Sequence, residues 1–256
     1  MRHLNISICL LIAATLFSCK GNTDATKTET PTAPATPSAS ETQTVPAVIR
    51  DKVLTTDEQK ALTPDMVIEG LKAGNKNFIA NAVTARDHSS MVIDAAAGQF
   101  PKAVILSCLD SRIPVEDVFD KGIGDLFIGR VAGNIVNEDL LGSMEFGCKV
   151  AGAKLIVVVG HSSCGAVKAA IDDVKLGNIT ALLSKIRPAV AKSQDYAGDK
   201  TTKNDSFVTH VAKNNVLGTI ESIRQRSAIL KEMADKGEIK IVGAFYDMKT
   251  GRVEFL

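Results

Sequence analysis

Three reactive side chains follow two apolar runs of the sequence. The run Ala-Val-Ile-Leu-Ser leads into Cys108, and the run Leu-Ile-Val-Val-Val-Gly leads into His161, with Cys164 three residues later. Two thiols and one imidazole are soft or borderline ligands that suit Zn²⁺. Three protein ligands leave the fourth tetrahedral position open, as in catalytic zinc sites. The residues therefore predict a catalytic metal centre, provided that the fold brings the ends of both runs together.

An aspartate and an arginine follow Cys108 at alternate positions. Alternate residues of an extended backbone share a face, so Cys108, Asp110 and Arg112 are expected on one side of the chain. For an isolated Cys-x-Asp-x-Arg, a buried free thiol followed by a surface ion pair is the commoner outcome. The second apolar run, which also ends in metal-ligand types, favours the chemical interpretation.

The elements that must position these residues follow from the hydrophobic pattern. Apolar runs predict strands at 101–108, 125–131 and 154–161, and two further strands at 238–248 and 251–256 joined by a hairpin turn. Helical spacing predicts helices at 63–83, 137–153, 164–177, 181–192 and 206–234, with Gly177 as the stop of the third and Pro188 kinking or breaking the fourth.

This alternation predicts an α/β fold. We expect a mostly parallel central β-sheet flanked by helices, with an antiparallel C-terminal edge and an N-terminal helical arm. Ligands of such sheets bind beyond the carboxyl ends of the strands, where Cys108 and His161 would both lie.

The N-terminal part of the chain has a different composition from the rest. Residues 1–18 have a short basic start and an apolar run, which predicts a signal peptide. Leu-Phe-Ser-Cys resembles a bacterial lipobox, which implies lipidation at Cys19. Residues 19–50 are rich in Thr, Pro and Ala and predict a disordered tether, with the catalytic domain at 51–256. We expect a lipid-anchored protein of the bacterial cell envelope, facing the periplasm or the surface; an ordinary secretory signal or an uncleaved anchor are the alternatives.

The amino-acid composition limits which kinds of molecule this protein is expected to bind. Thirty basic residues balance twenty-nine acidic ones, and Trp is absent, which argues against a nucleic-acid partner. Once Cys9 and Cys19 are assigned to the N-terminal segment, Cys108, Cys148 and Cys164 remain. An odd number of cysteines in an exported protein favours a metal site over a disulfide scaffold, and Cys148 is interpreted as a buried small hydrophobic residue.

Two motifs carry a family resemblance. Cys-Leu-Asp-Ser-Arg and, further along, Gly-His-Ser-Ser-Cys-Gly-Ala resemble the paired motifs of the β-class carbonic anhydrases, and shorter matches extend the similarity over most of 60–256. The resemblance implies reversible hydration of CO₂ to bicarbonate and a proton, with one Zn²⁺ per chain on Cys108, His161 and Cys164. It also implies that a zinc-bound hydroxide is oriented by Asp110, which Arg112 holds in place.

The resemblance implies a substrate pocket as well. Phe127 and Ala132 match its walls and Gln99 its amide donor; the alternatives are a core role for Phe127 and a plain loop position for Gln99. In the family this Gln reaches across a dimer interface, which implies a homodimer or a higher even oligomer. Val131 and Phe146 depart from residues common among relatives and affect the expected substrate contacts.

Other interpretations remain open at this level. A same-fold hydrolase of CS₂ or COS would keep the zinc and change the substrate, and a non-catalytic zinc-binding lipoprotein would need neither Asp110 nor Arg112. Some family members close the site when this aspartate ligates zinc, using an accessory pocket that includes a Trp. Ile105 stands at that position here, so we expect an open site with Asp110 paired to Arg112.

Overall fold

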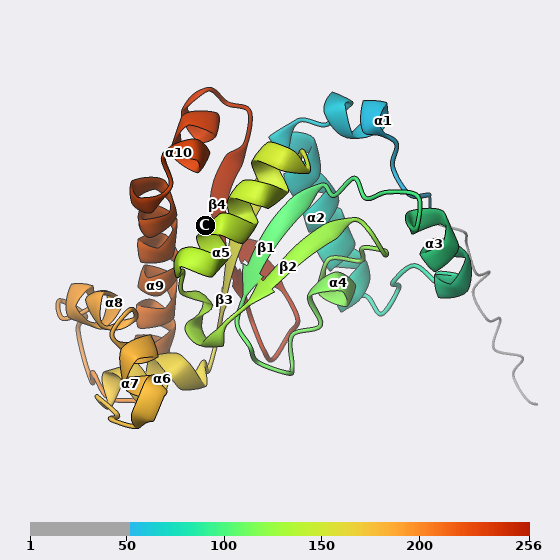
Figure 1. The fold of residues 1–256 in the computed structure, drawn as a ribbon. Coiled ribbons are helices and arrows are strands. Elements are labelled where there is room, and N and C mark those ends of the chain that lie inside the picture. Colours follow the sequence, from blue (N-terminus) through green and yellow to red (C-terminus); the bar gives the residue numbers. More distant parts are fainter. Residues whose placement is uncertain (1–51) are drawn as a thin grey trace, which may run out of the picture. The chain divides into compact units, whose positions relative to one another are not determined.

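The computed structural model describes residues 52–256 and contains a five-stranded sheet in the order β2-β1-β3-β4-β5 (Figure 1). The strands are β1 (Ala103–Ser107), β2 (Leu126–Arg130), β3 (Leu155–His161), β4 (Lys240–Tyr246) and β5 (Val253–Phe255). The first four are parallel, and β5 pairs antiparallel with β4. The predicted fold class is confirmed. The signal segment 1–18, Cys19 and nearly all of the tether lie outside the described residues.

The two central strands are buried along their whole length because helices cover both faces of the sheet. One face packs against α2 (Pro64–Ile79) and α4 (Val115–Val118), and the other against α5 (Glu138–Glu145), α9 (Asp205–Arg226) and α10 (Ala228–Asp235). Alternate residues of β1 divide between the faces, with Ile105 facing α2 and Leu106 facing α9. Each such side chain contributes about 1.5–3 kcal/mol through burial.

The first long helix begins where the sequence predicts. The Thr63 side chain accepts a hydrogen bond from the backbone N–H of Met66, and Pro64 occupies the first turn. The shorter α1 (Thr56–Ala61) precedes it and has a capping box formed by Thr55 and Glu58. These two helices form the N-terminal helical part of the described chain.

The prediction of one continuous helix over 206–234 is wrong. It divides at Ser227, whose backbone is extended and whose hydroxyl accepts from the Leu230 N–H, so that Ser227 ends α9 and caps α10. The same hydroxyl donates to Glu145 at 2.6 Å, which ties the break to α5. A serine inside an apolar helical pattern competes for backbone donors, and this tertiary contact decides the outcome.

Other helix boundaries also differ from the expectation. Gly177 begins a helix instead of ending one, and the segment 137–153 continues past α5 as a π-helical turn. The break expected at Pro188 is confirmed, since Pro188 lies in the first turn of a helix separate from the preceding one. The helix α3 (His88–Ala95) was not predicted. The remaining helical segments are α6 (Gly165–Ile171), α7 (Gly177–Leu183), α8 (Arg187–Lys192), η1 (Ala132–Asn134) and η2 (Phe146–Val150).

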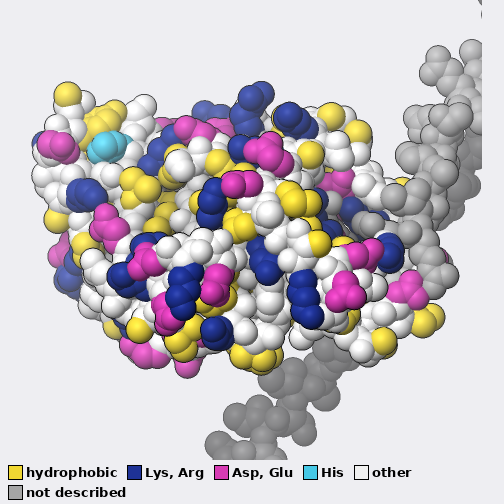
Figure 2. All heavy atoms as spheres, turned by 90° about the horizontal axis from the view of Figure 1, so that it is seen from above, with side chains coloured by type: hydrophobic (Ala, Val, Ile, Leu, Met, Phe, Trp, Pro, Cys, Tyr) yellow, Lys and Arg dark blue, Asp and Glu magenta, His cyan; other side chains and the backbone are white. Residues whose placement is uncertain are grey.

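The surface carries charges of both signs. On the face drawn in Figure 2, Lys and Arg side chains are interspersed with Asp and Glu, which agrees with the near-zero net charge. Within 52–256, no helix combines the length and apolar character needed to cross a bilayer.

Candidate metal centre

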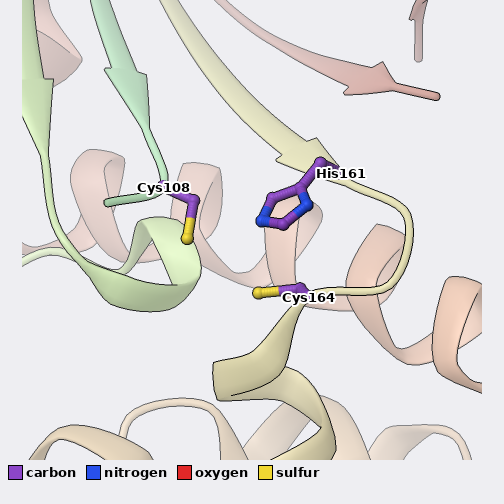
Figure 3. A group of neighbouring side chains, drawn as sticks. All are labelled: Cys108, His161 and Cys164. Atoms are coloured by element: carbon purple, nitrogen blue, oxygen red, sulfur yellow. The ribbon is translucent and has the colours of Figure 1, made fainter. Parts of the chain in front are cut away.

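Cys108, His161 and Cys164 meet at the carboxyl end of the sheet. Cys108 directly follows β1, His161 is the last residue of β3, and Cys164 is the N-cap of α6. Their ligand atoms all lie within 4.8 Å of one another, and Figure 3 shows the three side chains converging from three sides. All three side chains are buried. The predicted convergence of the two apolar runs is therefore confirmed, and this group is called the Cys-His-Cys triad below.

Strand register explains why the triad forms. Strands β1 and β3 pair in parallel with Ser107 opposite Val159, so both strands end at the same rim. Two residues beyond Val159, the ring of His161 is oriented by a 2.9 Å hydrogen bond between its Nδ1 and the Ser162 carbonyl. A carbonyl can only accept, so the proton is on Nδ1 and the lone pair is on Nε2. Nε2 is buried without a hydrogen-bond partner, as expected of a metal ligand.

The Cys108 sulfur is positioned from the other side by η1. The Gly133 N–H donates to Cys108 Sγ at 3.3 Å. Residue 133 has a φ of +73°, and a Cβ there would lie 2.5 Å from the Ile186 side chain. Glycine thus suits both the left-handed backbone conformation and the close packing against Ile186.

The two thiols of the triad have pKa values shifted in opposite directions. Hydrogen bonding from Cys164 lowers the pKa of Cys108, and the Gly133 N–H lowers it further, although burial opposes this. The same bond and burial raise the pKa of Cys164. One sulfur is therefore available as a thiolate, and binding of a cation would displace the proton from the other.

Asp110 and Arg112 form the predicted pair. Arg112 Nε donates to Asp110 Oδ1 at 2.9 Å and Nη2 donates to Oδ2 at 2.7 Å, which is a bidentate geometry. These bonds lower the pKa of Asp110 to about 2 despite partial burial. Asp110 Oδ2 also lies 3.9 Å from His161 Nε2. An ionised carboxylate, paired with arginine, thus stands beside the triad, and the open zinc site stays a prediction.

The three candidate substrate residues are not gathered at the triad. Ala132 begins η1, next to Gly133 and close to Cys108. Phe127 lies near the amino end of β2, where it packs against Phe146 and lines a groove of about 760 Å³ beside α5. Gln99 is an exposed loop residue that precedes β1, so it lies at the opposite end of that strand from Cys108. Their roles toward substrate stay predictions.

Comparison with known proteins settles the family. Residues 103–253 match the family model described as "Carbonic anhydrase". The chain belongs to the carbonic anhydrase family. It is 35% identical over 193 residues to carbonic anhydrase 2 of Mycobacterium tuberculosis, covering 72% of this chain and 88% of that protein. It is 34% identical to a carbonic anhydrase of Mycolicibacterium smegmatis, covering 73% and 90% of the two chains. Carbonic anhydrase is accordingly its enzyme class.

Solved structures place the fold in the β class. The β-carbonic anhydrase of Aspergillus fumigatus matches with a TM-score of 0.58 at 26% identity, over 74% of this chain and 90% of that one. A tetrameric β-carbonic anhydrase of Sordaria macrospora has a TM-score of 0.59 at 23% identity, over 66% and 86% of the two chains. The match to the Sordaria macrospora structure shows that the two chains share a fold.

Some groups at the site escaped the sequence analysis. The Gly133 N–H, the Ser162 carbonyl and the Arg130 side chain all contact the segments that carry the triad or Asp110. Backbone donors and acceptors leave no residue-type signal. The clue available in the sequence was the Gly133-Asn134 dipeptide, which is a turn signal shortly after the strand expected at 125–131.

Proposed function

We propose that this carbonic anhydrase catalyses the reversible hydration of CO₂ to bicarbonate and a proton, with one zinc ion per chain held by Cys108, His161 and Cys164. The convergence of three soft or borderline ligand atoms within 4.8 Å carries the proposal. The donor chemistry fits Zn²⁺, and the buried, unpartnered Nε2 of His161 has the lone pair that a metal requires. Bound zinc would supply the acidity that brings the pKa of water from about 16 towards 7.

Asp110 orients the attacking water in this proposal. Its carboxylate is ionised and can only accept, so it takes a hydrogen bond from that water and directs the remaining lone pair towards CO₂. Arg112 holds both carboxylate oxygens and keeps Asp110 from turning towards the triad. A purely structural metal site would need neither residue, so the formed pair favours catalysis over the scaffold alternative.

The active unit is at least a homodimer in this proposal. Gln99 lies at the amino end of β1, whereas the triad lies at the carboxyl end, so Gln99 can serve a substrate only from a second chain. Exposed apolar side chains at Leu109, Phe146 and Val150 provide surface that such a partner would bury. Phe127 and Ala132 would line the apolar space for CO₂. Sedimentation analysis of the wild-type protein should give an even oligomer.

Lipid anchoring at Cys19 completes the proposal and places the enzyme in the bacterial cell envelope. Its support is the signal-like segment and the tether composition of the sequence. Cys19→Ala should move the protein from the membrane fraction to the soluble fraction. Unchanged membrane association would assign anchoring to the apolar segment instead.

Stopped-flow CO₂ hydration combined with metal analysis tests the reaction. The wild-type chain should bind about one zinc, and Cys108→Ser or Cys164→Ser should lose zinc and activity together because three ligands leave little redundancy. Cys148→Ser is the matched control, since Cys148 is buried outside the triad with a pKa raised to about 12 by burial. Full zinc and activity in Cys164→Ser would overturn the ligand assignment. Sulfide release from COS that exceeds CO₂ hydration would overturn the substrate.

A further inference from the structure

Arg130 extends the link between β1 and β2 beyond the end of the strands. The last backbone bond of this ladder runs from the Val131 N–H to the Ser107 carbonyl at 3.2 Å. The Arg130 side chain then donates from Nε to the Cys108 carbonyl at 3.0 Å and from Nη2 to the Asp110 carbonyl at 2.5 Å. One guanidinium therefore holds two peptide groups of the segment that carries a triad thiol and the site carboxylate.

The charged guanidinium of Arg130 donates its hydrogen bonds to backbone carbonyls and not to a side chain. Among residues 52–256, Arg130 makes no ion pair with a carboxylate, whereas Arg112 is fully engaged with Asp110. Hydrogen bonds from a charged donor are about twice as strong as neutral ones, and the planar fork fixes the relative orientation of its two acceptors. The geometry of the fork suits a positioning task.

Asp110 depends on this fork more than Cys108 does. The Cys108 side chain is buried in a hydrophobic cluster and receives the Gly133 N–H, so its position has independent support. Besides the fork, the Asp110 backbone is held by a 3.3 Å bond from the Ile113 N–H to its carbonyl and by the contact of its own N–H with the Cys108 sulfur. Its side chain is bonded to Arg112, which is itself more than half exposed and two residues away on the same segment.

We propose that Arg130 is a positioning residue that fixes the Asp110 backbone, and through it the carboxylate, relative to the Cys-His-Cys triad. This inference rests on the proposed roles of Asp110 and the triad. Arg130 is the last residue of the edge strand β2. Its side chain therefore couples the position of that strand to the position of the Asp110 backbone. Arg130 would act without touching the substrate.

The test compares Arg130→Ala, Arg130→Lys and the wild-type enzyme. We expect kcat of Arg130→Ala to fall roughly 10- to 100-fold, with KM within about twofold, because misplacement of a catalytic group weakens the reacting geometry rather than substrate binding. A lysine side chain at this position can reach one of the two carbonyls. The kcat of Arg130→Lys should therefore lie between those of Arg130→Ala and the wild type. Guanidinium ion at a non-denaturing concentration should partly restore kcat to Arg130→Ala.

Two further readouts separate positioning from folding and from metal binding. Arg130→Ala should retain its zinc, and its cobalt-substituted form should keep the thiolate-to-cobalt absorption bands of the wild type. Arg224→Ala is the matched control, since Arg224 is an arginine on α9 that pairs with Asp235 and has no contact with the triad or Asp110 among the interactions of the described residues. It should leave kcat unchanged.

The inference fails if kcat of Arg130→Ala stays within twofold of the wild type, or if zinc is lost in proportion to kcat. A rise in KM that accounts for the whole loss in kcat/KM also overturns it. These outcomes differ from failure of the proposed function, in which the wild-type enzyme itself would hydrate no CO₂.

Discussion

Asp110 and Asp120 are each paired with an arginine, but the two pairs differ in how far they are removed from solvent. The side chains of Arg86 and Asp120 are 10% and 3% exposed, whereas those of Arg112 and Asp110 are 58% and 15% exposed. Asp120 lies between α4 and β2, with Arg86 Nη1 at 2.7 Å. The same two residue types thus form a buried network in one region and an accessible pair beside the triad in the other.

The causes of the lowered pKa values separate the two regions further. Both carboxylates have a pKa lowered to about 2. At Asp120 burial opposes ionisation, and bonds from Asn77, Arg86 and Thr84 outweigh it. At Asp110 the side-chain hydrogen bonds from Arg112 are the leading cause of the lowered pKa. A similar pKa therefore does not identify a similar role: the buried network around Asp120 suits stability, whereas the proposed function gives Asp110 its role in the chemistry.

The largest expected effect is on turnover in Asp110→Ala. We expect kcat to fall by about 10²- to 10³-fold, because the variant loses the acceptor that orients the attacking water. Zinc should be retained, since Asp110 is not one of the three ligands. Because Arg112 is largely solvated, the free energy of unfolding should change by less than about 1 kcal/mol. Stopped-flow assays, metal analysis and urea unfolding measure the three quantities; a zinc-free variant would make Asp110 structural.

Asp120→Asn should show the opposite pattern. Removing the charge of Asp120 breaks its buried pair with Arg86 and should lower the free energy of unfolding by about 3–5 kcal/mol. Turnover per folded, zinc-loaded molecule should stay within about twofold, since Asp120 contacts no residue of the triad. Asp110→Asn is the matched control for the loss of a carboxylate. A stable Asp120→Asn enzyme with reduced kcat would reverse the comparison.

Acid unfolding gives a smaller and more gradual effect. A carboxylate whose pKa is lower in the folded than in the unfolded state stabilises the fold above its unfolded pKa of about 3.9, and this contribution is lost as pH falls towards 2. For Asp120 the loss should be about 2 kcal/mol between pH 5 and pH 2. Asp120→Asn should lack this part of the pH dependence. Parallel stability curves for the variant and the wild type would contradict the assignment.

The smallest expected effect concerns backbone conformation. Ser163, between two ligands of the triad, has a φ of +56°, and Asp120 has a φ of +49°. Ser163→Gly should stabilise the fold by about 0.5 kcal/mol, because relief of the left-handed strain slightly exceeds the entropy cost of glycine. Asp120→Gly should destabilise it, because the hydrogen bonds of the network are lost. Urea unfolding measures both; destabilised Ser163→Gly would show that the serine side chain has a structural partner.

Sequence reasoning succeeded where residue type and strand ends carried the information. Cys108, His161 and Cys164 are recognisable because each is a metal-ligand type after or near a buried strand, and parallel strands end at a common rim. It failed at Ser227, where the helical pattern continues but a bond to Glu145 on another helix ends α9. It also missed α3, a short helix whose exposed Val92 and Ile93 interrupt any clean apolar face.

The sequence by itself determined which groups are available for chemistry: two thiols, an imidazole, and a carboxylate spaced two residues from an arginine. Side-chain chemistry and local backbone alternation depend on nearby residues, so they can be read along the chain. Only the tertiary structure decided that Arg130 reaches the Cys108 and Asp110 carbonyls, that Gly133 donates to the Cys108 thiol, and that Gln99 lies at the far end of β1. These contacts join strands, loops and η1 through backbone groups, and backbone groups are the same at every residue.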